Sequence, residues 1–78
     1  DINIGDNECK TPLMLVCLRG NLAIAKFLIK KGADINKFDV DGYNPLILAF
    51  LGSNLEIVKF LIENGADINK SDDNGETP

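Results

Sequence analysis

The chain has 78 residues, a formal net charge of -4 and no histidine. This length allows at most one small domain, and the acidic balance opposes the phosphate attraction that dominates nucleic-acid binding, so no nucleic-acid partner is expected. The longest uninterrupted apolar runs, residues 13–18 and 46–51, are far shorter than the roughly 18 residues of a membrane span, so the sequence predicts no membrane insertion.

Cys9 and Cys17 are the two cysteines of the chain. Without a histidine to complete a ligand set they do not predict a zinc site, and no motif calls for a cofactor. Nucleophilic catalysis would need a base beside a thiol, so no enzyme activity is expected. Two cysteines are too few for disulfide bonds to hold a fold of this size together. This favours a reducing compartment, the cytoplasm or the nucleus. We interpret Cys17, inside an apolar run, as a small buried side chain.

The sequence repeats itself with a period of 33 residues. Residues 26–37, KFLIKKGADINK, return at 59–70 as KFLIENGADINK, and the three prolines obey the same offset. Shifting the chain against itself by this period gives identities at roughly half of the overlapping positions, which indicates a structural repeat. We predict one segment, 1–78, composed of the tail of a preceding repeat (1–5), two full repeats (6–38 and 39–71) and the head of a following repeat (72–78).

Each repeat is predicted to open with a reverse turn and a short helix. Asp39, in the turn of the second repeat, can accept hydrogen bonds from backbone N–H groups two residues on. The first helices are expected over residues 12–18 and 45–51, because a capping side chain, Thr11 or Asn44, precedes a proline at the first helical position. These helices are apolar nearly all round and must be covered on several sides.

A tight loop then leads to a second helix. Gly20 and Gly52 are predicted to end the first helices. Asn21 and Asn54 are predicted to cap the second helices with their side-chain oxygens.

The second helix carries a wide apolar arc, which implies packing on its own first helix and on the neighbouring repeats. In the second repeat it covers residues 55–63. Gly32 and Gly65 lie where a left-handed residue would terminate it. The side chains expected to form the core are Leu13, Leu46, Phe27 and Phe60.

The repeat resembles the ankyrin repeat over the entire chain. The head pattern D-x-x-G-x-T-P-L is matched by Asp39, Gly42, Pro45 and Leu46, and the tail pattern G-A-D-I-N by residues 65–69. The resemblance implies a mostly α-helical solenoid of stacked antiparallel helix pairs linked by β-hairpin-like loops. It also implies stacking on neighbouring ankyrin repeats of the parent chain.

Four residues depart from the family pattern, and one of them, Asn44, replaces the usual threonine but can still cap the helix. Met14 and Ile47 stand where the family usually has a histidine that bonds the threonine, so packing is expected to replace that network. Cys9 stands at the usual turn glycine, where a side chain costs on the order of 1 kcal/mol if φ is positive.

The resemblance implies a protein-protein interaction module that binds a protein partner through its hairpin tips and the concave face of its first helices. Phe38, Val40 and Tyr43 are aromatic or apolar residues at a turn, which suggests an interface; alternatively, Phe38 or Tyr43 folds back on the adjacent loop. Leu18 and Leu51 are expected to be partly packed against neighbouring helices. The complete candidate surface comprises Asn7, Glu8, Lys10, Leu18, Arg19, Phe38, Val40, Asp41, Tyr43, Leu51, Ser71, Asp73, Asn74 and Glu76.

Two other functions remain open. The repeats are structural spacers within a longer array, or they regulate a larger enzyme or channel in cis. Lys30, Lys31 and Lys37 form a local basic spot, which we interpret as a solvated edge and not as a phosphate site.

Overall fold

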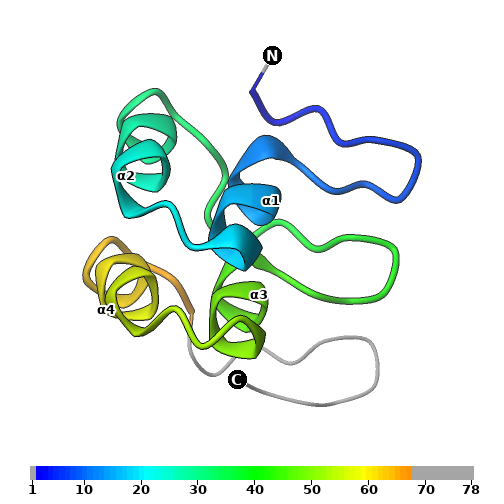
Figure 1. The fold of residues 1–78 in the computed structure, drawn as a ribbon. Helices are drawn as coiled ribbons and strands as arrows, with labels where there is room; N and C mark the ends of the chain where they lie inside the picture. The colour runs from blue at the N-terminus through cyan, green and yellow to red at the C-terminus, as the bar shows by residue number, and fades with distance from the viewer. Residues whose placement is uncertain (1, 68–78) are drawn as a thin grey trace.

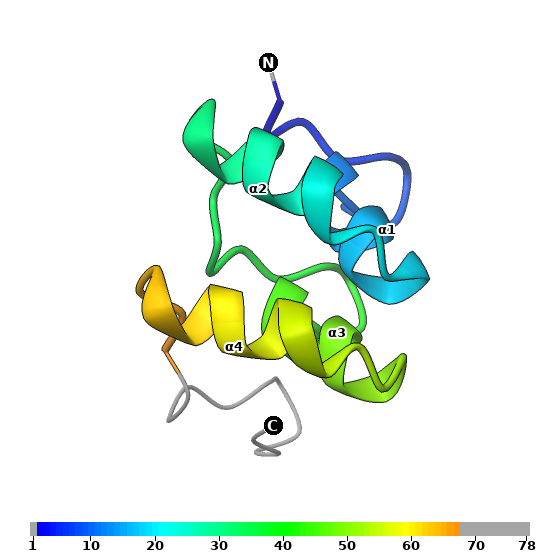
Figure 2. The same ribbon diagram turned by 60° about the vertical axis from the view of Figure 1, so that its left-hand side comes forward.

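A computed structural model describes residues 2–67 of the chain. This part contains four helices and no β-strand: α1 (Pro12–Arg19), α2 (Leu22–Lys30), α3 (Pro45–Leu51) and α4 (Leu55–Glu63). Helices α1 and α2 form one pair and α3 and α4 form the next, with α1 packed on α3 and α2 on α4 (Figure 1). The turned view shows α2 and α4 side by side (Figure 2). The predicted stack of helix pairs is confirmed.

The first helix of each pair begins as its capping signals predict. The Asn44 side-chain oxygen accepts a hydrogen bond from the backbone N–H of Ile47 at 2.8 Å, and the Thr11 hydroxyl accepts one from Met14 at 3.4 Å. Each cap is followed by proline at the first helical position. Both caps are buried, so these bonds satisfy helix N–H groups that water does not reach.

Met14 does more than fill the core. Its thioether sulfur accepts a hydrogen bond from the backbone N–H of Thr11 at 3.4 Å, so the two residues bond reciprocally. Packing was expected to replace the family's histidine network, and the side chain is fully buried. The sulfur contact, which the sequence did not predict, restores a weak part of that network.

The two first helices end differently. Gly20 adopts φ 94° at the end of α1, as predicted, but Gly52 has φ -81° and the following residue, Ser53, takes the left-handed conformation at φ 57°. Gly52 therefore ends α3 as predicted, but without the left-handed conformation. This glycine is needed for space, because a Cβ there would lie 2.7 Å from the carbonyl oxygen of Leu18. The second helices end as predicted, with a left-handed glycine after each.

Asn21 and Asn54 occupy equivalent positions, but their side chains make different hydrogen bonds. The Asn21 side-chain oxygen accepts from the backbone N–H of Ile24 at 3.2 Å, which confirms its capping role. Asn54 makes no side-chain cap bond. Its Nδ2 instead donates to the carbonyl oxygens of Cys17 at 2.7 Å and Leu18 at 3.2 Å, across the interface between the helix pairs. The capping prediction for Asn54 was therefore wrong, because its side-chain amide bonds to α1 and its oxygen does not cap α4.

The core lies between the two helix pairs. Leu13 and Leu46 are buried, as predicted. Cys17 is also fully buried, and burial raises the pKa of its thiol to about 12, so it acts as an apolar side chain. The remaining buried members of the cluster are Ala25, Ala49, Ile57 and Leu61.

The core prediction was wrong for the two phenylalanines. Phe27 is 57% exposed, and Phe60 is only half-buried. Successive helical residues turn by about 100°, so Phe27 points away from the core that Ala25 enters two positions earlier. Each ring lies near a lysine ammonium instead, Lys31 at 5.6 Å from Phe27 and Lys26 at 5.7 Å from Phe60.

Candidate partner-binding surface

An aspartate shapes each of the two hairpin-like loops that project from the first helices. One carboxylate oxygen of Asp6 accepts from the backbone N–H groups of Glu8 at 2.8 Å and Lys10 at 3.0 Å. These bonds lower the pKa of the Asp6 carboxyl, and the bond from the Lys10 N–H has the larger effect. Asp39 makes the same bonds, 33 residues later, to Asp41 and Tyr43, each at 2.9 Å. The turn predicted around Asp39 is confirmed.

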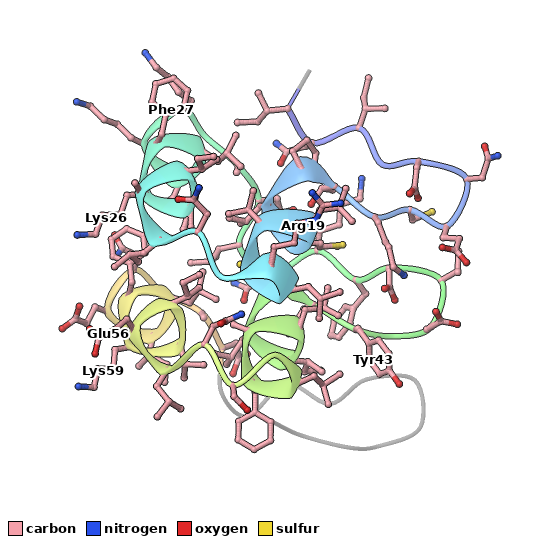
Figure 3. All side chains as sticks on the ribbon, in the orientation of Figure 1. Arg19, Lys26, Phe27, Tyr43, Glu56 and Lys59 are labelled. Atoms are coloured by element: carbon pink, nitrogen blue, oxygen red, sulfur yellow. The ribbon has the colours of Figure 1, made fainter. Side chains whose placement is uncertain are left out.

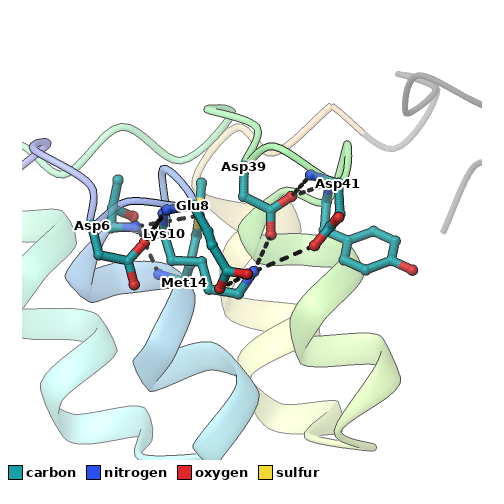
Figure 4. Close-up of polar contacts among 8 residues, drawn as sticks. Asp6, Glu8, Lys10, Met14, Asp39 and Asp41 are labelled. Carbon is teal, nitrogen blue, oxygen red and sulfur yellow. Dashed lines mark hydrogen bonds and ion pairs between the residues drawn. The ribbon is translucent and has the colours of Figure 1, made fainter.

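The loops are also tied to each other. The Lys10 ammonium lies 2.9 Å from a carboxylate oxygen of Asp39, and 3.9 Å and 3.8 Å from carboxylate oxygens of Glu8 and Asp41 (Figure 4). The backbone N–H of Val40 donates to the carbonyl oxygen of Glu8 at 2.9 Å. The two tips therefore form one joined surface.

The ion pair between Lys10 and Asp39 is partly buried and affects both groups. Burial of the Asp39 carboxyl raises its pKa, but the hydrogen bonds from the Lys10 ammonium and from two backbone N–H groups outweigh this, so the pKa lies below its usual value. The hydrogen bond to Asp39 is the main cause that raises the pKa of Lys10. The Asp39 side chain has no exposed surface, so this pair belongs to the frame of the site.

Cys9 is held in a strained backbone conformation at the first tip. Its φ is 64°, close to the 81° of its equivalent, Gly42. The left-handed region favours glycine because a Cβ crowds the backbone there. The strain expected from the sequence is confirmed.

The extended returns after the second helices are joined by asparagine side chains. Asn3 accepts from the backbone N–H of Asp34 at 2.6 Å and donates to the carbonyl oxygen of Gly32 at 3.2 Å. Asn36 repeats the first bond to Asp67 at 3.1 Å. This ladder fixes the spacing of consecutive returns, and the backbone N–H groups of Asp34 and Asp67 take part in it.

Comparison of the two repeats separates stacking faces from free surface. Leu15 and Ile24 are 39% and 45% exposed, but their equivalents Leu48 and Ile57 are 4% and 1% exposed because the first helix pair covers them. On the opposite end, Phe50 is 55% exposed while its equivalent, Cys17, is fully buried. These residues are exposed because they lie on an end face of the stack, so we do not count them in the candidate partner-binding surface.

A comparison with protein families agrees with this arrangement. The family model described as Ankyrin repeats (3 copies) matches residues 1–72. The chain belongs to the ankyrin-repeat family. A 39-residue stretch of this ankyrin-repeat chain is 46% identical to the Transient receptor potential channel pyrexia of Drosophila melanogaster. The match spans 50% of this chain and 4% of the channel.

Two leucines at equivalent positions of the ankyrin repeats are exposed in both. Leu18 is 43% exposed and Leu51 is 57% exposed, at the ends of α1 and α3. Because the first helix pair leaves Leu51 uncovered, stacking does not explain its exposure. Both leucines are partly packed, as expected, and the rest of each side chain faces solvent. They form the apolar centre of the candidate surface.

The remaining candidate residues of the ankyrin surface differ in exposure. Val40 is 55% exposed, whereas Phe38 and Tyr43 are half-buried, so the aromatic part of the tip is less open than its sequence suggests. The Lys10 side chain is 19% exposed and bonded to Asp39. Ser71, Asp73, Asn74 and Glu76 lie outside the described residues. The polar candidates that are exposed are Asn7, Glu8, Arg19 and Asp41.

The outer helices present a different surface. Lys26, Phe27 and Lys59 point away from the hairpin loops, on the side formed by α2 and α4 (Figure 3). Within residues 2–67, Lys30 and Lys31 have no carboxylate at ion-pair distance, and the Lys37 ammonium donates to the carbonyl oxygen of Asn3 at 2.8 Å.

The described residues contain no group of three or more histidine, cysteine, aspartate or glutamate side chains that could hold a metal ion. Across residues 2–67, no helix has the length and apolar character needed to cross a membrane.

Proposed function

We propose that this chain recognises a protein partner through the surface made by its two hairpin tips and the exposed leucines of its first helices. The exposure of Leu18 and Leu51 supports this most strongly, because equivalent apolar side chains remain uncovered whether or not another helix pair lies alongside. Exposed apolar groups between polar neighbours are typical of interfaces.

The frame of this surface suits recognition. The hydrogen bonds of Asp6 and Asp39 set the loop shape, and the contact between Lys10 and Asp39 joins the loops. A surface that is ordered before binding loses little conformational entropy on association, which favours affinity.

A double variant, Leu18→Ser with Leu51→Ser, tests the proposal in a capture experiment from cell lysate. The matched control is Leu55→Ser, because Leu55, the first residue of α4, is 64% exposed and is not part of the candidate surface. Circular dichroism first confirms that both variants keep their helices. A partner that is lost with the double variant and kept with the control supports the proposal. A partner kept by both variants would place binding elsewhere and favour the spacer function.

Regulation in cis of a larger protein is a second candidate. It is supported by the 46% identity to a stretch of the pyrexia channel. In that case the surface would bind another segment of the same polypeptide. Sequencing the transcript on both sides of these 78 codons tests this directly: channel-type membrane spans support regulation in cis, and further ankyrin repeats alone argue against it.

A further inference from the structure

The charges of the described residues are unevenly distributed between the two sides of the molecule. Exposed carboxylates gather at the hairpin tips, where Asp6, Glu8 and Asp41 all face solvent. The cation of this region, Lys10, lies 2.9 Å from the buried carboxylate of Asp39. The Lys10–Asp39 pair is neutral as a whole, so the other three carboxylates give the tips a net negative charge.

The outer helices have a small positive balance, three lysines against two glutamates. Helix α2 contains lysine but no acidic residue, whereas α4 carries Glu56 and Glu63 with Lys59, and Glu56 lies 3.9 Å from Lys59 on the outer side (Figure 3). This difference in charge between the tips and the outer helices favours binding of a charged partner on one side of the molecule. An acidic partner would be repelled by the tips, and a basic one attracted.

The apolar centre and the acidic tips are close enough for one short segment to reach both. The tips precede the first helices, and the exposed leucines lie at their ends. A helix of 8 residues is about 12 Å long. An extended peptide spans the helix length in about four residues at roughly 3.3 Å per residue. Glu8 and Asp41 precede the helices, so about four residues is the minimum spacing.

We propose that the partner is a basic polypeptide segment that carries an aliphatic side chain at least about four residues from its lysine or arginine residues. The aliphatic side chain packs on Leu18 and Leu51, and the basic residues lie against Glu8 and Asp41. This inference rests on the proposed function and adds the chemistry of the partner. The Arg19 guanidinium, at the end of α1 (Figure 3), disfavours a further positive charge beside the leucines.

The test is a selection from a library of random linear twelve-residue peptides displayed on phage, with the whole chain as bait. Phage that also bind the Leu18→Ser, Leu51→Ser variant are removed in each round. The recovered peptides are expected to be rich in lysine or arginine with leucine, isoleucine, valine or methionine at the stated spacing. Binding of the recovered peptides, made synthetically, is expected to weaken as salt rises.

Two charge variants with the same net charge locate the attraction. Glu8→Gln with Asp41→Asn removes two carboxylates at the tips, and is expected to weaken peptide binding roughly tenfold. Glu56→Gln with Glu63→Gln removes two from the exposed surface of α4, and is expected to change binding less than twofold. Circular dichroism melts verify that both variants remain folded.

Each outcome decides between the proposals. Leucine-dependent peptides that are neutral or acidic would overturn the basic partner and leave the proposed function intact. Equal weakening by both charge variants would also overturn it, because the attraction would then be a general effect of net charge. A selection that yields no leucine-dependent peptide would contradict the proposed function and this inference together.

Discussion

Substitution of Asn54 by aspartate distinguishes a bond between repeats from a helix cap. Aspartate caps helices about as well as asparagine and suits the positive end of the helix dipole, so a capping role predicts a change within about 0.5 kcal/mol. The structure predicts a larger loss. Asn54 Nδ2 donates to the carbonyl oxygens of Cys17 and Leu18, and a carboxylate has no hydrogen to donate.

The size of that loss follows from the two bonds. A hydrogen bond contributes about 1 kcal/mol net, and a buried acceptor left unpaired costs more. Asn54→Asp removes two bonds and places a negative charge beside two carbonyl oxygens, so the expected loss is about 2 kcal/mol or more. This is a large share of the stability of a small domain.

Urea unfolding followed by far-UV circular dichroism measures this loss. The matched control is Asn21→Asp, because Asn21 Oδ1 accepts from the backbone N–H of Ile24 and aspartate keeps that acceptor. The control is expected to unfold within about 0.5 kcal/mol of the original chain. If Asn54→Asp unfolds at the same urea concentration as the control, the bond between repeats contributes nothing and the reasoning fails.

Three further predictions concern the tip and the core. Cys9→Gly is expected to stabilise the fold by about 1 kcal/mol, because φ is 64° there; a lower unfolding midpoint in urea would contradict it. Leu13→Ala should cost about 3 kcal/mol and Phe27→Ala less than about 1 kcal/mol, since Leu13 is fully buried and Phe27 is 57% exposed; equal losses in urea melts would refute this assignment. The folded pKa of Asp39 is lowered, so its stabilisation is present above the ordinary aspartate pKa of about 3.9 and is lost as pH falls through the folded pKa. Asp39→Asn should therefore be less stable than the original chain at pH 7 and approach it in acid, and a difference that is constant with pH would count against the ion pair with Lys10.

The parts of the fold that were predictable from the sequence are those with local causes. The caps Thr11 and Asn44 act on N–H groups three residues away, and Gly32 and Gly65 adopt the left-handed conformation that ends a helix. Such signals lie within a few residues of the structure that they produce. A single repeat therefore contains the information needed to place its own helices.

The parts that the sequence did not reveal depend on the neighbouring repeat. The bond from Asn54 to Cys17 joins residues 37 positions apart, and that from Lys10 to Asp39 joins residues 29 apart. No local pattern distinguishes Asn54 from Asn21, since each precedes a helix beginning with leucine. The wide apolar arc of the second helix likewise gave no way to tell that Phe27 lies outside the core.

The candidate surface was predictable only through the family resemblance, and the structure refines it by comparing equivalent positions. Leu51 keeps its exposure beneath the first helix pair, whereas Leu48 does not. That contrast needs two stacked repeats, so neither composition nor spacing could provide it.

The residues that join the repeats are distinct from those that the surface offers to a partner. Asp39 is buried and Lys10 is largely covered by its ion pair, while Glu8, Val40 and Asp41 share the same loops and face solvent. Substitutions at the exposed positions can therefore change recognition with little effect on the stack. The reverse holds for Asp39, because its loss would remove the shortest ion pair between the tips and leave the hydrogen bond from Val40 to Glu8 and the longer contact between Lys10 and Asp41 to join them. In the proposed function, stability and recognition would thus depend on different residues of the same loop.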